Sequence, residues 1–188
     1  KQKPLPEVTD EEKPFEIPES WEWVRVEDLV KFKIDNRGKT PSHYKEKKEG
    51  LIDLLEINSL IPYGGVNRLK VEKFVDIETF KTAFRSGHPK KGDILIATVG
   101  SVGKYSIMDE EIGCIAQNII AIRSFNYTTQ MYLFNALNSN ILLRSLNNIT
   151  MKGVQPSVKV PVLLSMLIPL PPLAEQKRIV EKVDQLFA

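Results

Sequence analysis

The segment 93–99, with the sequence DILIATV, carries the strongest structural signal in this chain of 188 residues. Its residues are nearly all apolar and several are β-branched, which predicts a β-strand. Gly100 and Gly103 follow at the spacing of a tight turn, and residues 104–108 have the pattern of a returning strand. We therefore expect a fold that contains a sheet with this pair of strands.

Further strands and helices are predicted on both sides of this pair. Predicted strands show runs of apolar, aromatic and β-branched residues, whereas predicted helices show apolar residues at intervals of three and four. A short apolar element is expected at 162–168. The pattern predicts one mixed α/β (α+β) domain over residues 20–170. Its other strands are expected at 21–26, 51–57 and 114–122, and its helices at 78–84, 129–138 and 141–149, the last as an extension or as a separate helix.

The two ends of the chain differ from this central domain. Residues 1–19 are rich in Pro and Glu and have little apolar periodicity, so we expect an extended, weakly ordered lead-in. In residues 171–188, two prolines stand where a helix begins, and Glu175 supplies an acid to its first turn. No capping residue precedes Ala188, so we expect this segment to be the start of a longer helix.

The C-terminal helix carries an apolar stripe. Ile179, Val183 and Leu186 recur at spacings of four and three, as in coiled coils. Because a single amphipathic helix cannot bury such a stripe alone, we expect these residues to form a subunit interface. The stripe would meet a partner helix, a second copy of the chain or the domain to which it is attached.

The composition limits the class of protein to which the chain can belong. Cys114 is the only cysteine, which excludes an internal disulfide and favours a cytoplasmic protein. We interpret Cys114 as a small buried apolar residue. The apolar runs are short and interrupted, so we expect no membrane span and no signal peptide. The net charge is only +2, so a DNA-binding surface would require basic residues gathered on one face.

Two segments resemble catalytic motifs but lack required residues. Residues 100–104 resemble a phosphate-binding loop, yet Thr98 stands in place of the first glycine and Tyr105 in place of the magnesium-binding Ser or Thr. The segment LPPL at 170–173 has the prolines of a base-amino methyltransferase motif but neither its polar residue nor its aromatic residue. These departures predict a chain without catalytic activity.

A metal-dependent nuclease is the alternative from a different class of protein. Asp35, with Glu46 and Lys48, formally fits an acidic pattern that holds a metal ion beside a scissile phosphate. These residues flank a loop with Pro and Gly, which favours a solvated loop instead. The two histidines and the cysteine are isolated in sequence, so we expect no metal site.

Three polar loops carry residue types that contact DNA. Cations and hydroxyl groups suit phosphates, whereas Arg and amide side chains suit base edges. By this chemistry Lys104 and Lys152 are assigned to phosphates, and Gln155 with Arg37 to bases. From composition alone, solvent-exposed loops without a ligand explain them equally well. The candidates for DNA contact are Arg37, Lys39, Ser42, Tyr44, Lys45, Arg85, His88, Lys90, Ser101, Lys104, Lys152, Gln155, Ser157 and Lys159.

Several short motifs occur together along almost the whole chain. They are PFEIPESWEWVR at 14–25, GDILIA at 92–97, GSVGK at 100–104, AQN at 116–118, GVQPSV at 153–158 and IPLPPLAEQKRIV at 168–180. Together they resemble the target-recognition domain of specificity subunits from type I restriction-modification systems, and the last motif is the most specific. The resemblance implies a non-catalytic chain that binds double-stranded DNA and reads one half of a bipartite target.

The resemblance also implies partners. Modification (methyltransferase) subunits bring S-adenosylmethionine, and the restriction subunit brings ATP-driven translocation and cleavage, with magnesium, while this chain binds no cofactor. A second recognition domain, or a second copy of the chain, is expected to pair through the C-terminal helix as an antiparallel coiled coil. The chain holds one such domain and the start of one helix, which fits a fragment or a half-subunit. A recognition domain of a fused methyltransferase-nuclease is the alternative of the same general kind.

Overall fold

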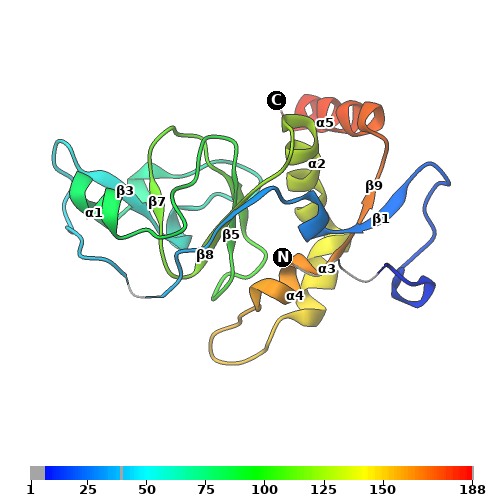
Figure 1. The fold of residues 1–188 in the computed structure, drawn as a ribbon, viewed down its shortest axis with the longest axis horizontal. Coiled ribbons are helices and arrows are strands. Elements are labelled where there is room, and N and C mark those ends of the chain that lie inside the picture. The colour runs from blue at the N-terminus through cyan, green and yellow to red at the C-terminus, as the bar shows by residue number, and fades with distance from the viewer. Residues whose placement is uncertain (1–6, 39, 188) are drawn as a thin grey trace.

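The computed structural model describes residues 7–38 and 40–187. Lys39, a predicted DNA contact, lies outside these ranges, as do Ala188 and the first six residues of the predicted lead-in. Figure 1 shows an elongated molecule with a strand-rich half, a helical half and a central sheet between them.

The helices and strands that the sequence predicts are present with shifted bounds, and the strands Phe32–Ile34 and Phe74–Val75 were not predicted. The strands are β1 (Glu22–Arg25), β2 (Phe32–Ile34), β3 (Ile52–Leu55), β4 (Phe74–Val75), β5 (Ile94–Ala97), β6 (Tyr105–Ile107), β7 (Cys114–Ile115), β8 (Ile119–Arg123) and β9 (Leu167–Leu170). The helices are α1 (Ile77–Thr82), α2 (Tyr127–Leu137), α3 (Asn140–Ile149), α4 (Val160–Leu164) and α5 (Leu173–Phe187). Short 3-10 turns lie at Asp10–Glu12, Val26–Leu29, Ile57–Ser59 and Arg68–Lys70.

The strands form three sheets. The central sheet has the order β2–β8–β5–β6 and is antiparallel throughout. A second sheet, β4–β3–β7, combines an antiparallel pair with a parallel pair. β1 and β9 form an antiparallel pair, which joins the start of the domain to the segment just before α5.

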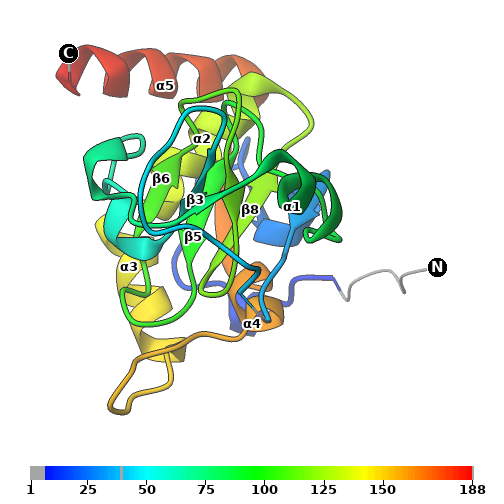
Figure 2. The same ribbon diagram turned by 90° about the vertical axis from the view of Figure 1, so that its left-hand side faces the viewer.

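The strands β5 and β8 are buried on both faces, which explains their nearly continuous apolar sequence. Successive side chains point to opposite faces of a sheet. One face packs against the helical half and is formed by Ile94, Ile96, Ile120 and Ile122. The other face packs against the β4–β3–β7 sheet and is formed by Leu95, Ala97, Ile119 and Ala121. Figure 2 shows β3 in front of β5, with α2 and α3 behind it.

A buried glutamine fixes α2 to the central sheet. Gln130 donates hydrogen bonds to the carbonyl oxygens of Gly92 and Ile122, at 2.9 and 3.1 Å. Its own side-chain oxygen accepts a hydrogen bond from the Ser124 amide at 2.6 Å. Both donors and the acceptor of this buried amide therefore have partners, as a stable interior requires.

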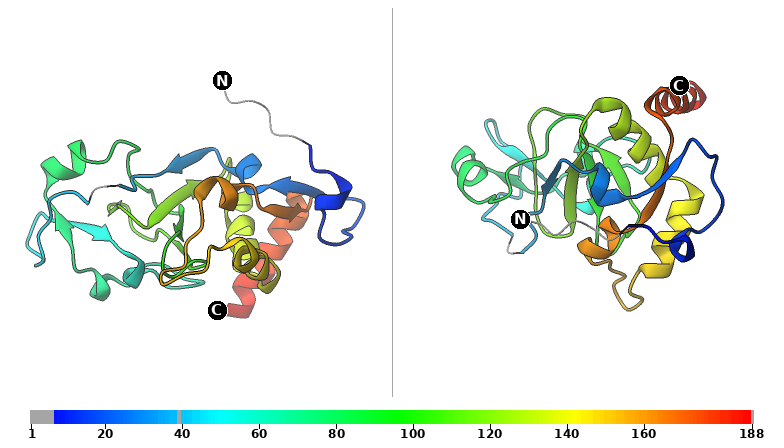
Figure 3. Two further views of the ribbon diagram at one scale, coloured as in Figure 1. Left: turned by 90° about the horizontal axis from the view of Figure 1, so that it is seen from below. Right: turned by 45° about the vertical axis from the view of Figure 1, so that its right-hand side comes forward.

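The helix α5 packs along α2, and Figure 3 shows it in red against the helical half of the molecule. Gln176 accepts a hydrogen bond from the Thr129 hydroxyl at 3.0 Å and donates one to the Pro171 carbonyl at 2.8 Å. Val180 is buried in the same core. The indole of Trp21 donates to Glu175 at 3.1 Å. The first turns of α5 therefore belong to the same domain as the sheets.

The structure refines several expectations from the sequence. The region 114–122 contains two strands of different sheets, because β7 pairs with β3 and β8 pairs with β5. The segment 141–149 is a separate helix, since Ser139 caps a new start by accepting a hydrogen bond from the Leu142 amide. The element at 162–168 divides between α4 and β9. In the predicted lead-in, Glu12 forms an ion pair with Arg25 of β1 at 2.9 Å.

Asp93 provides a test of how the start of β5 is fixed. Its carboxylate is 1% exposed and accepts hydrogen bonds from the Arg123 guanidinium at 2.6 and 2.7 Å. We expect Asp93→Ala to lower the free energy of unfolding by about 3 kcal/mol, because it removes one partner of a buried, bidentate ion pair. Urea denaturation measures this loss. Asp10→Ala is the control, since the pair of Asp10 with Lys13 is exposed; an equal loss in both variants would contradict the account.

Candidate nucleic-acid interface

The end of β5 and the start of β8 lie together at one edge of the central sheet. The Asn118 carbonyl accepts hydrogen bonds from the amide and the hydroxyl of Thr98, at 2.8 and 3.1 Å. These bonds join the turn at 98–101 to the crossing segment 116–118. Within the turn, Gly103 has a φ of 87° and packs closely against α3, where an added Cβ would meet Leu146 at 3.1 Å.

A projecting loop lies beside this turn. The Gly100 amide donates to the Pro156 carbonyl at 2.7 Å, and the Val158 amide donates to the Thr98 carbonyl at 2.9 Å. Met151 and Ser157 exchange two backbone hydrogen bonds, at 2.8 and 3.2 Å, which close the loop at its base. Figure 1 shows this loop on the lower side of the molecule. The predicted contact residues on this loop are Lys152, Gln155 and Ser157, and Ser157 forms a β-bridge with Val99 of the turn.

Two further loops meet on the other side of the crossing segment. Asn36 donates to the Gly87 carbonyl at 2.8 Å and accepts from the Ser86 amide at 2.9 Å. The Gln117 amide nitrogen lies 3.4 Å from the Gly38 carbonyl oxygen, which connects these loops to the crossing segment. We call this continuous surface the loop edge; it comprises residues 35–38, 85–87, 98–101, 116–118 and 151–158.

The loop edge places several polar side chains in solvent. Arg37, Arg85, Lys152 and Gln155 are all exposed. Arg37 also forms a bidentate ion pair with Asp35, at 2.8 and 2.9 Å. Burial raises the pKa of Asp35, but the hydrogen bond and charge of Arg37 outweigh it and hold the pKa below its ordinary value. The carboxylate therefore stays ionised and orients the guanidinium, whose remaining N–H groups are available to a ligand.

Other predicted contact residues lie away from the loop edge or are engaged within the fold. Lys104 donates to the Ile57 carbonyl at 2.9 Å, and burial, together with the charge of Lys70, lowers its pKa. His88 stacks on Phe80 with ring centroids 3.6 Å apart, and burial lowers its pKa.

The remaining candidates occupy the flanks. Tyr44 pairs through its backbone with Phe74. Ser42 and Lys45 are exposed in the same loop, and Ser42 lines a groove with residues of α1. Lys90 precedes β5, so the strand separates it from Ser101. Lys159 is exposed directly after the projecting loop.

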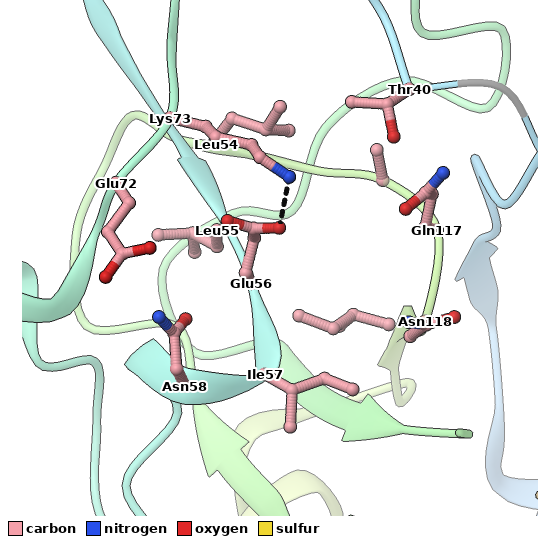
Figure 4. A pocket seen from close by; sticks show the side chains of 12 residues that line it. Thr40, Leu54, Leu55, Glu56, Ile57, Asn58, Glu72, Lys73, Gln117 and Asn118 are labelled. Atoms are coloured by element: carbon pink, nitrogen blue, oxygen red, sulfur yellow. Dashed lines mark hydrogen bonds and ion pairs between the residues drawn. The ribbon is translucent and has the colours of Figure 1, made fainter. Parts of the chain in front are cut away.

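A pocket of about 340 Å³ opens between the central sheet and the β4–β3–β7 sheet (Figure 4). Lys73 crosses part of it and forms an ion pair with Glu56 at 2.6 Å. Amide, carboxylate and hydroxyl groups line the rest, which gives the pocket both hydrogen-bond donors and acceptors. Its polar lining residues include Thr40, Asn58, Glu72, Gln117 and Asn118.

Gln117 and Asn118 were missed as candidate contacts by the sequence reasoning. The available signal was a pair of amide residues interrupting an otherwise apolar run, between Ile115 and Ile119. That pattern did not reveal that the chain changes sheets there, which brings both side chains to the loop edge.

The structure does not favour the catalytic alternatives. Asp35 is committed to Arg37, and across residues 7–38 and 40–187 no group of three His, Cys, Asp or Glu could hold a metal ion. Cys114 is buried as predicted, and burial, with the nearby charge of Asp53, raises the pKa of its thiol to about 12. The thiol is therefore protonated at neutral pH and is a poor nucleophile. Of the described helices, none is long and apolar enough to cross a membrane.

The predicted apolar stripe on α5 divides between the interior and the surface. Ile179 packs against the core of its own domain, and Val183 is half-buried. Leu186 is 71% exposed. Phe187 stacks near Tyr63, with ring centroids 6.5 Å apart. The exposed part of the stripe is therefore confined to the last turn of the helix.

Comparisons with known proteins identify relatives of the whole chain. A family model described as "Type I restriction modification DNA specificity domain" matches residues 18–188. The type I restriction enzyme EcoAI specificity subunit of Escherichia coli is 30% identical over 199 residues, which cover 100% of this chain and 32% of that subunit. The MjaVIII specificity subunit of Methanocaldococcus jannaschii is 27% identical over 180 residues, which cover 91% of this chain and 40% of that subunit.

A solved structure shares the fold. The HsdS subunit from Thermoanaerobacter tengcongensis superposes with a TM-score of 0.64 at 22% identity, covering 92% of this chain and 38% of that subunit. These comparisons confirm the mixed α/β fold class and the resemblance that the sequence motifs indicated. The chain spans less than half of the length of each of these relatives. The chain belongs to the family of type I restriction modification DNA specificity domains.

Proposed function

We propose that this chain recognises one half of a bipartite sequence in double-stranded DNA for a type I restriction-modification enzyme. The observation that carries the proposal is the convergence of separate loops on one edge of a rigid sheet. Binding residues are commonly placed on loops that a rigid scaffold positions, because the loops can vary without loss of the core. The family to which the chain belongs is a DNA specificity family, which supports the same reading.

The partners follow from this proposal. The chain supplies recognition without catalysis or a cofactor, in the cytoplasm, and other subunits supply the chemistry. Modification subunits bring S-adenosylmethionine, and the restriction subunit brings ATP and magnesium. The exposed Leu186 on α5 supports a contact with a second recognition domain or a second copy of the chain.

The side chains of the loop edge have two roles in this proposal. Lys152 is exposed beside Gly153, where the backbone can approach a phosphate closely, so it positions the DNA. Gln155 and Arg37 carry groups that pair with base edges. Lys104 has the same sequence assignment as Lys152, but its hydrogen bond to the Ile57 carbonyl makes it a less direct probe.

Lys152→Ala tests the phosphate role. We expect weaker binding to every duplex, and a plot of log Kd against log salt whose slope falls by about one unit, because one phosphate contact is lost. Fluorescence anisotropy over a salt series, with a selected and a scrambled duplex, measures both effects. Lys182→Ala, exposed on α5, is the matched control. Unchanged binding of Lys152→Ala to the scrambled duplex would rule out the role.

Gln155→Ala tests base reading. We expect the variant to lose roughly 1–3 kcal/mol of binding free energy on the selected duplex and to relax the preference at one base pair. Its affinity for the scrambled duplex should not change, because no phosphate contact is removed. The same titrations give the answer, and equal weakening on both duplexes would show that Gln155 does not read a base.

Leu186→Asp tests the α5 contact. The side chain is 71% exposed, so the thermal unfolding midpoint of the domain should stay the same. We expect self-association to weaken at least roughly tenfold, because the change places a charge in an apolar seam. Sedimentation over a concentration series measures this. Identical profiles for wild type and variant would exclude the last turn of α5 from a contact between two copies of the chain.

A further inference from the structure

Gln117 occupies a backbone position that disfavours any side chain. It lies between β7 and β8, where the chain passes from the β4–β3–β7 sheet to the central sheet within residues 116–118. Its φ is 49°, in the left-handed region that residues other than glycine rarely adopt. Strain of this kind persists only where the surroundings hold it in place.

The neighbouring backbone holds Gln117 from both sides. The Ile119 amide donates to the Gln117 carbonyl at 2.6 Å, which closes a tight turn. On the same side, Asn118 is anchored to Thr98 by the two hydrogen bonds described above, and Thr98 is completely buried. On the other side, Ile115 is buried and pairs with Leu55 of β3. The position of Gln117 is therefore fixed before any ligand binds.

A glycine would make the same turn without strain, so the glutamine side chain needs an explanation. Across the described ranges, positive φ is otherwise confined to glycines and Tyr63. Tyr63 uses its side chain within the fold, because its hydroxyl donates to the Asn138 carbonyl at 2.8 Å and its ring stacks on Phe187. In the described structure, Gln117 is exposed and its amide makes one long contact, 3.4 Å to the Gly38 carbonyl.

The location of Gln117 suits a DNA contact. Figure 4 shows its side chain beside Thr40, across the pocket from the Glu56–Lys73 ion pair. Gln117 contacts the 35–38 loop, while the next residue is bonded to the 98–101 turn. The amide therefore lies in the middle of the loop edge, between Arg37 on one side and the projecting loop on the other.

We propose that Gln117 is a specificity-determining residue that reads an adenine in the major groove. Its side-chain nitrogen would donate to adenine N7 and its oxygen would accept from the adenine N6 amino group. A primary amide matches this neighbouring donor and acceptor, whereas guanine presents two acceptors at the same edge. The inference rests on the proposed function, since it requires that the loop edge binds DNA.

Selection from a randomised duplex library tests the inference. Duplexes that bind the wild-type chain are selected and sequenced first. The sequence that they share establishes DNA recognition independently of Gln117. The same library is then applied to Gln117→Leu, which keeps a side chain on the strained backbone but removes the amide. Gln185→Leu is the matched control, because Gln185 is exposed on α5 away from the loop edge.

We expect Gln117→Leu to lose preference for adenine at one position by about 5- to 150-fold, with the other positions unchanged. Arg37→Ala should lose preference at a different position. The control should select the wild-type sequence. Gln117→Gly should lose the same adenine while its thermal unfolding midpoint equals or exceeds that of wild type, because glycine relieves the strain.

Three results would overturn the inference and leave the proposed function intact. If the wild-type chain selects a sequence and Gln117→Leu selects the same one, the domain recognises DNA without Gln117. If Gln117→Leu and Arg37→Ala lose base preference at the same position of the selected sequence, Gln117 acts by positioning the 35–38 loop. If Gln117→Gly unfolds several degrees below wild type, the side chain serves the fold. A wild-type chain that selects no sequence contradicts the proposed function itself and, with it, this inference.

Discussion

Burial of the β5–β8 pair on both faces is the constraint on which the rest of the structure depends. Both faces are apolar, so the register depends on how side-chain volumes fit the two cores. One core receives four isoleucines from this pair and the other receives Leu95, Ile119 and two alanines. A slip of one residue would exchange these two sets, which would crowd one core and leave cavities in the other. The ends of these strands are therefore held in place.

That rigidity matters for recognition because the loop edge begins where the two strands end. Three of its segments, 98–101, 116–118 and 151–158, are joined through backbone atoms, from the Gly100 amide to the Pro156 carbonyl and from Thr98 to the Asn118 carbonyl, whereas 35–38 and 85–87 are held by the Asn36 side chain. Backbone bonds of this kind do not depend on which side chains the loops carry. Side chains on these three segments can therefore change while the platform stays the same, as is common for loops that a rigid scaffold positions.

The sequence predicted the parts of this fold that depend on local patterns. The apolar run at 93–99, the helical spacing at 129–138 and the prolines before α5 each have a local physical cause. Sheet membership could not be predicted, because it depends on contacts between distant residues: nothing local shows that β7 pairs with β3 while β8 pairs with β5. The same limit applied to the site. Side-chain chemistry identified Arg37 and Gln155 as candidates from the sequence. Gln117 became a candidate only when the structure showed that the chain passes between two sheets at this residue.

DNA bound along the loop edge would shield the backbone amides of that surface from solvent, and amide hydrogen exchange detects such shielding. The chain would be measured free and bound to the duplex that it selects. The account predicts slower exchange on binding within residues 35–38, 85–87, 98–101, 116–118 and 151–158, with α5 and the β1–β9 pair unchanged. Protection centred on α5 or on the β1–β9 pair, with the loop edge unaffected, would contradict it.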